Sequence, residues 1–252
     1  GVIGKVVLPA LFAPVIAGIV AATGTWLVMR LSRTISQRYA NAGFKWGQIG
    51  TASLVSLSHG TNDAQKTMGV ITLALIGAGM WHDTHAIPWE VKVACAIAIA
   101  LGTFLGGWRI IRTMGKGLVE ISPPQGVAAE SSSACVILAS SQLGFALSTT
   151  HVATGSIMGT GLGAPGGKVR WRVAGRMVIA WLITLPCAGA VGALMYLLNP
   201  LLGPIWGPIV IFGIMVGLAL WMFMHSRRDI VDPHNVNDEW EPTTPAPEKA
   251  SV

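Results

Sequence analysis

Long apolar runs constrain this chain more than any other feature of its sequence. Each of the four longest is close to the roughly 20 residues that an α-helix needs to cross about 30 Å of hydrocarbon. The chain is 52% hydrophobic and only 11% charged, whereas soluble domains are about 25% charged. A core of this size cannot bury so much apolar surface, so the sequence predicts an all-α membrane protein. The expected spans are 6–29, 93–108, 177–198 and 205–224. The second of these runs is short, so we expect its helix to begin before Lys92.

Basic residues gather in short clusters between these runs and indicate an orientation in the membrane. The net charge is +6, but no aromatic residues are interleaved with the clusters, so the pattern does not indicate nucleic-acid binding. Loops rich in Lys and Arg stay on the cytoplasmic side. The sequence therefore predicts a multi-pass protein of the cell (plasma) membrane, with its N-terminus outside and its C-terminus in the cytoplasm. The expected cytoplasmic loops are 30–45, 109–116 and 168–176, and the expected outer loops are 81–92 and 199–204.

Two further segments, 48–80 and 127–163, are membrane-like but contain glycine, polar and ionisable residues. Segment 48–80 is too long for one straight span, and we expect it to break near residues 58–63. Segment 127–163 must enter and leave on the same side, as two half-spans or as two spans that turn at 147–151. Non-helical backbone at membrane depth is tolerated only where protein or a water-filled cavity covers it, and such breaks mark binding sites in transporters. Both segments are therefore predicted to be broken or re-entrant and to contain the functional site.

The first polar constellation lies at residues 58–66. Gly60 can break a helix, and one of residues 61–63 can cap the helix that follows. A helix restarting there would direct free backbone N–H groups and its dipole at the break, which favours an anion. Asp63 has the opposite preference, because a carboxylate beside an anion needs a cation or a proton between them. The pattern therefore predicts that a cation and an anion bind together.

These residues also have purely structural interpretations. Asp63 could cap the helix and pair with Lys66 three residues later. His59 could be an ordinary packing residue, and Lys66 could extend to the membrane surface. Ionisable groups inside membranes are costly, which favours a functional role for Asp63.

The second constellation is the Ser-Thr-Thr-His run at 148–151. Its successive hydroxyls are neutral donors that suit an oxyanion, at the expected start of a helix. Gly155, Gly159 and Gly163 follow at four-residue spacing and would let another helix approach closely. The structural alternative is a helix cap on a packing helix.

Other sequence features indicate neither catalysis nor a resident cofactor. Cys95, Cys135 and Cys187 occur singly and form no metal or disulfide pattern. The glycine spacing at 161–166 follows no predicted strand, so it does not indicate a nucleotide site. Glu130 is either a second intramembrane acid or a solvated residue near the cytoplasmic rim. No metal site, cofactor or catalytic residue is predicted, and the chain is not expected to be an enzyme.

At the two constellations the chain resembles the inorganic phosphate transporter (PiT) family. That family has a Gly-Ala-Asn-Asp motif and a Pro-Val-Ser-Thr-Thr-His motif in each of two inverted halves; here the motifs read Gly-Thr-Asn-Asp at 60–63 and Ala-Leu-Ser-Thr-Thr-His at 146–151. Ala146 replaces the usual proline, which makes the break there less predetermined, and Thr61 replaces the usual alanine. The resemblance implies phosphate binding by Asn62, Ser148, Thr149 and Thr150, coupling-cation binding by Asp63, and support from His59, Thr61, Gln65 and His151.

The resemblance covers residues 1–226 and implies one membrane domain, the C-terminal half of an inverted-repeat transporter. It implies uptake of inorganic phosphate, free or as a metal complex, by symport with a proton or sodium. The expected partners are the N-terminal half of the same transporter and the lipid bilayer. Further copies of the chain in a homo-oligomer are also expected partners, and nucleic acid is not expected to bind. Residues 227–252 are rich in acids and proline and predict a disordered cytoplasmic tail.

Two other functions are compatible with the same residues. A divalent-metal carrier would use His59, Asp63 and His151 as ligands, and it predicts metal dependence without phosphate dependence. An intramembrane hydrolase would use Ser148 with a histidine, but the sequence shows neither a residue to orient that histidine nor an oxyanion turn.

Overall fold

A computed structural model describes residues 3–32, 37–145 and 147–226, and the elements within these ranges are helical. The described ranges contain no strand, only an isolated bridge between Val119 and Val169. The all-α prediction is therefore confirmed. The predicted tail 227–252 and Ala146 lie outside the described residues. The helices are α1 (Leu8–Ser32), α2 (Gln37–Gly77), α3 (Trp89–Gly106), α4 (Trp108–Arg112), α5 (Pro123–Gln142), α6 (Thr149–Gly163) and α7 (Trp171–Ser226), with π-helical turns at Ile3–Val7 and Thr113–Leu118.

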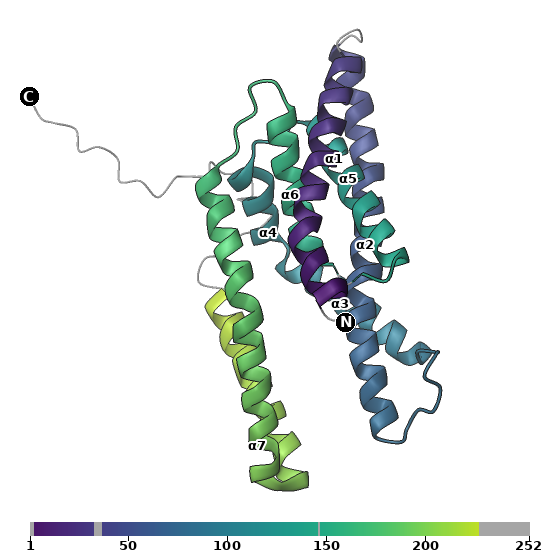
Figure 1. The fold of residues 1–252 in the computed structure, drawn as a ribbon, viewed down its shortest axis with the longest axis vertical. Helices are drawn as coiled ribbons and strands as arrows, with labels where there is room; N and C mark the ends of the chain where they lie inside the picture. The colour runs from purple at the N-terminus through teal and green to yellow at the C-terminus, as the bar shows by residue number, and fades with distance from the viewer. Residues whose placement is uncertain (1–2, 33–36, 146, 227–252) are drawn as a thin grey trace, which may run out of the picture. The chain divides into compact units, whose positions relative to one another are not determined.

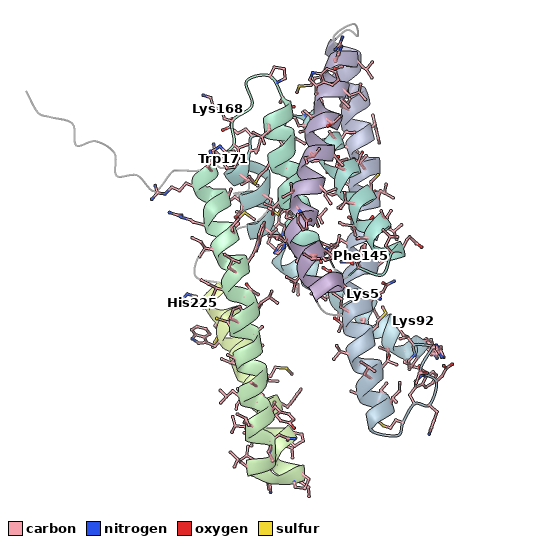
Figure 2. The ribbon with its side chains drawn as sticks, in the orientation of Figure 1. Lys5, Lys92, Phe145, Lys168, Trp171 and His225 are labelled. Atoms are coloured by element: carbon pink, nitrogen blue, oxygen red, sulfur yellow. The ribbon has the colours of Figure 1, made fainter. Side chains whose placement is uncertain are left out.

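Three helical stretches within the described ranges are long and apolar enough to cross a membrane: Gly4–Ser32, Trp89–Gly106 and Trp171–His225. The first two contain nearly all of the predicted spans 6–29 and 93–108, and α3 begins before Lys92, as expected. Large apolar side chains on these helices face outward (Figure 2), which suits contact with lipid. The orientation of the loops in the membrane stays a prediction.

Helix α7 forms a unit of its own and is interrupted once. Gly203 has φ 82° and ψ 170°, a conformation that only glycine adopts without strain. A Cβ on Gly207 would lie 2.3 Å from Asn199 Oδ1, so the residues on either side of the break lie close together. The interruption lies inside the predicted turn 199–204 and separates the predicted spans 177–198 and 205–224 (Figure 1).

Helices α1 to α6 belong to the other unit. Within it α1 packs on α5 and α6, α5 packs on α2, and α3 packs on α2 (Figure 1). A small apolar core lies beside the α5–α6 connection and consists of Ala13, Ala17, Ile137, Leu147 and Val152, with Val136 packed against it.

The glycines at four-residue spacing on α6 let α1 approach, as predicted. A Cβ on Gly155 would lie 2.1 Å from the carbonyl oxygen of Pro14, and a Cβ on Gly159 would lie 2.1 Å from that of Gly18. Gly163 has the same relation to Ala22, at 2.3 Å. Real Cβ atoms do not tolerate such distances, so glycine is required at each position.

The predicted break near residues 58–63 is wrong, because α2 runs unbroken from Gln37 to Gly77. The hydroxyls of Ser58 and Thr61 donate to the carbonyls of Leu54 and Leu57, at 2.7 and 2.9 Å. They therefore bond to the helix they belong to and do not cap a new one. A glycine inside a helix costs only about 1 kcal/mol, and the rest of this long helix offsets that cost at Gly60.

The second predicted interruption is confirmed as a helical hairpin, in which α5 ends at Gln142 and α6 begins at Thr149, so residues 149–151 of the predicted turn belong to α6. Gly144, at φ 69°, follows the end of α5 with two backbone hydrogen bonds: its own N–H donates to the carbonyl of Ser141, and the N–H of Phe145 donates to the carbonyl of Ser140, the pattern of a Schellman cap. Ser148 caps α6 by accepting from His151 N at 3.5 Å. Gln125 near the start of α5 donates to Thr160 near the end of α6 at 3.2 Å, so the two helices are antiparallel.

The α1–α6 contact predicts a specific packing defect. We expect Gly159→Ala to destabilise the protein by about 1–3 kcal/mol, because the new methyl group meets backbone that cannot move aside. Gly69→Ala is the matched control, since nothing lies within 4 Å of its Cβ position. Thermal unfolding in detergent checks this: a lower midpoint for Gly159→Ala alone is expected, and equal midpoints for both variants would contradict the close packing.

Candidate functional site

The polar face of α2 meets the first residue of α6 around one carboxylate, that of Asp63. His59, Asp63 and Lys66 lie three or four residues apart on α2, so they share one face of the helix. Asn62 lies beside them, and Thr149 approaches from α6. We call these five residues the Asp63 cluster.

Both oxygens of the Asp63 carboxylate are hydrogen-bonded. Oδ1 accepts from Asn62 Nδ2 and from Lys66 Nζ, each at 3.0 Å. Oδ2 accepts from the Thr149 hydroxyl at 3.0 Å and lies 3.3 Å from His59 Nδ1. His59 Nδ1 is also 2.9 Å from Thr149 Oγ1. Because the Thr149 hydroxyl gives its only proton to Asp63, the histidine is the donor in that last contact.

The carbonyl of Leu147 provides a second link between the helices. It precedes α6 and belongs to the non-helical turn, so it needs a partner outside the helix. Asn62 Nδ2 donates to it at 3.3 Å, and Lys66 Nζ donates to it as well. The Leu147 side chain points the other way, into the apolar core. The turn is therefore held on one side by packing and on the other by polar groups of α2.

The Asp63 cluster has a closed side and an open side. Asn62 and Thr149 are only 5% and 6% exposed. The side chains of Asp63 and Lys66 are 30% and 45% exposed. The carboxylate is therefore partly exposed on the side away from Asn62 and Thr149.

The start of α6 is a second polar feature, next to the carboxylate. The backbone N–H groups in its first turn, including those of Thr149 and Thr150, have no carbonyl of the same helix to bond to, because no helical turn precedes them. The hydroxyl of Thr150 is exposed and has no hydrogen-bond partner among the described residues. Free N–H groups, hydroxyls and the positive end of the helix dipole together suit an anion.

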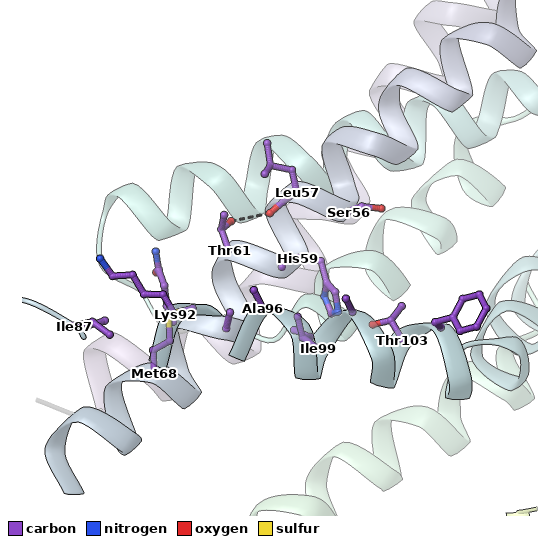
Figure 3. Close-up of a pocket in the computed structure, with 15 residues that line it drawn as sticks. Ser56, Leu57, His59, Thr61, Met68, Ile87, Lys92, Ala96, Ile99 and Thr103 are labelled. Atoms are coloured by element: carbon purple, nitrogen blue, oxygen red, sulfur yellow. Dashed lines mark hydrogen bonds between the residues drawn. The ribbon is translucent and has the colours of Figure 1, made fainter. Parts of the chain in front are cut away.

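The remaining predicted residues lie elsewhere. Thr61 and Gln65 line a groove of about 930 Å³ between α2 and α3, where the Thr61 hydroxyl bonds back to Leu57 (Figure 3). The side chain of His151 hydrogen-bonds to the backbone of Ala10 on α1, so it does not join the cluster. The described residues contain no group of three side chains suited to a metal ion. The three ligands that the alternative of a divalent-metal carrier would use, His59, Asp63 and His151, are therefore not brought together.

Two features were missed from the sequence. The first is the bridge that Lys66 makes between Asp63 and Leu147; its spacing from Asp63 indicated the ion pair but not the contact with a carbonyl 81 residues away. The second is the hydrogen bond from Thr51 on α2 to Glu130 on α5, which Gln48 supplements. Glu130 is half-buried against α2 and is not a freely solvated residue.

Fold and site together define a class of protein. A polytopic helical membrane protein with an interrupted hairpin, and a carboxylate at the interruption, is typical of secondary transporters. The chain belongs to the phosphate transporter family, whose model matches residues 1–192. This family consists of transporters and not of enzymes.

Relatives in several bacteria support this assignment. The chain is 57% identical over 243 residues to a protein of Mycobacterium tuberculosis (strain H37Rv) named a probable low-affinity inorganic phosphate transporter, covering 96% of this chain and 58% of the relative. A protein of Bacillus subtilis with the same name is 40% identical over 76% of this chain and 58% of its own length. The chain thus spans somewhat more than half the length of these relatives.

A solved structure has the same fold. It is described as the sodium-dependent phosphate transporter and matches with a TM-score of 0.53 over 73% of this chain and 57% of that one. The two sequences are 23% identical, so the comparison supports the helical architecture and nothing finer.

The Asp63 cluster predicts unequal effects at two adjacent threonines. Thr149→Val should lower the free energy of unfolding by about 1.5–3 kcal/mol, because a charged acceptor loses its donor. Thr150→Val should have an effect near zero, since its hydroxyl is exposed. Thermal unfolding of the purified protein checks this, and a destabilisation at Thr150 equal to that at Thr149 would contradict the contact with Asp63.

Proposed function

We propose that this chain supplies a phosphate and coupling-cation site of a secondary transporter that takes up inorganic phosphate across the cell membrane by symport. The observation that carries the proposal is the contact of Asp63 with the first residue of α6 at 3.0 Å. This contact places the Asp63 carboxylate, which attracts a cation, next to the start of α6, which attracts an anion. The names of the relatives, low-affinity inorganic phosphate transporters, support phosphate as the anion.

The anion part of the site is the start of α6. Ser148 and Thr150 offer hydroxyls there, and the first-turn N–H groups, that of Thr149 included, offer further donors; the Thr149 hydroxyl joins them when its proton leaves Asp63. Asn62 is buried against the same turn, where its amide donates to Asp63 and to the Leu147 carbonyl, and we propose that it turns one of these N–H groups to the anion. A phosphate dianion needs donors in place of its lost hydration on every side. The described residues supply them from one side, so we propose that another part of the same transporter completes the site, in keeping with the greater length of the relatives.

The cation part of the site is Asp63. A carboxylate close to a bound dianion is repelled by it unless a proton or a cation intervenes. Binding of the anion therefore favours cation binding, and the reverse follows because linkage is reciprocal. Symport needs this mutual dependence. Uptake measured with and without divalent metals distinguishes free phosphate from a metal complex.

Ser148 is engaged in a helix cap and not in a nucleophile–base pair. Its oxygen accepts from the backbone N–H of His151, so the geometry does not favour a hydrolase.

Replacing Asp63 by Asn should uncouple the transporter. The variant keeps the shape of the side chain but loses the negative charge. The rate of phosphate uptake driven by a cation gradient should therefore fall by about tenfold or more. Asp83→Asn, which changes an exposed acid in the loop before α3, should have no effect. Radiolabelled phosphate uptake by the whole gene product, at matched amounts in the membrane, checks this. Normal uptake by Asp63→Asn would reduce Asp63 to a structural residue.

Thr150 provides the cleanest test of the anion site, because its hydroxyl is exposed. Thr150→Val removes a donor and leaves a phosphate oxygen unpaired at about 1–3 kcal/mol, so apparent phosphate affinity should weaken by roughly tenfold or more. Thr150→Ser should retain it. Concentration-dependent uptake measures the effect. Wild-type affinity in Thr150→Val would place phosphate away from the start of α6.

A further inference from the structure

The described structure places a cation of its own in the Asp63 cluster, the ammonium group of Lys66. Nζ donates to Asp63 Oδ1 at 3.0 Å and also to the Leu147 carbonyl. A side chain that simply extended to the membrane surface would direct its ammonium away from the helices. This one instead points at a carboxylate on its own helix and a carbonyl on another.

The two oxygens that Lys66 contacts are the kind that bind an alkali cation. In secondary transporters, backbone carbonyls at unwound positions coordinate the driving cation, and hard cations prefer carboxylate and carbonyl oxygen. Leu147 lies in the unwound turn before α6, and Asp63 supplies the carboxylate. Thr149 Oγ1 adds a third oxygen nearby, bonded to the same carboxylate.

The charges around Asp63 are already balanced. The charged or titratable side chains that face Asp63 are Lys66 and His59, both on α2, while α6 contributes only the hydroxyl of Thr149. One carboxylate paired with one ammonium leaves no net charge to attract a metal cation. Ionisable residues inside membranes are usually paired in this way.

We propose that Lys66 is a tethered cation that occupies the place of a sodium ion in this part of the site. The proposal rests on the proposed function, since it assumes that Asp63 needs a positive partner for phosphate to bind. It makes Lys66 a positioning residue that sets which cation the site accepts. With Lys66 present the coupling cation at Asp63 is a proton and not sodium; without it, the carboxylate and the Leu147 carbonyl become available to a sodium ion.

Removing the ammonium should therefore create a sodium requirement. Lys66→Met keeps the aliphatic stem, Lys66→Arg keeps the charge, and Lys92→Met is the matched control, an exposed lysine on α3 outside the cluster. Phosphate uptake by the whole gene product is measured in sodium chloride and in choline chloride at equal ionic strength. For wild type, Lys66→Arg and Lys92→Met, each protein should take up phosphate at the same rate in sodium chloride as in choline chloride. Lys66→Met should fall at least about tenfold in choline and recover in sodium.

Thermal unfolding provides a second measurement, which detects sodium binding even if Lys66→Met is folded but takes up no phosphate. Sodium chloride, compared with choline chloride, should raise the thermal unfolding midpoint of purified Lys66→Met and leave that of wild type unchanged. If Lys66→Met shows neither sodium-rescued uptake nor a sodium-dependent shift, the proposal is overturned. Sodium-dependent uptake by wild type also overturns it, while leaving the proposed function intact. If wild type takes up no phosphate in either salt, the proposed function fails, and the unfolding measurement still decides the role of Lys66.

Discussion

The carboxylate of Asp63 is the constraint around which this part of the molecule is organised. An unpaired charge inside a membrane is costly, so Asp63 needs hydrogen-bonding and charged partners in the packed structure. They come from two helices far apart in the sequence: Asn62 and Lys66 from α2, and Thr149 from α6. The carboxylate therefore fixes the position of the start of α6 relative to α2 as well as being available to a ligand.

Close helix packing holds the other side of α6. Gly155, Gly159 and Gly163 bring its backbone against α1, where no side chain can adjust. The Leu147 side chain is buried beside the same interface, while its carbonyl faces α2. The turn before α6 thus lies between a rigid apolar contact and a polar cluster. Such a position suits a binding site, because the groups that meet a ligand are already oriented.

The sequence predicts what depends on composition and spacing, and misses what depends on tertiary partners. Apolar runs located α1, α3 and both parts of α7, and four-residue glycine spacing predicted a close helix neighbour of α6. The prediction that Gly60 breaks α2 was wrong. A single glycine does not end a helix by itself, and the hydroxyls that could have capped a new helix bond to carbonyls of α2 instead. The motifs identified Asn62, Asp63 and Thr149, but not the Lys66–Leu147 contact or the Thr51–Glu130 contact. Spacing along one chain segment gives no signal for a partner 79 to 81 residues away.

The most direct test of the central claim is an experimental structure of the whole gene product with phosphate bound. We expect anion density at the first turn of α6, within hydrogen-bond distance of residues 148–150 and on the side that faces Asp63. Well-ordered phosphate at another place, with the start of α6 free of any anion, would contradict it.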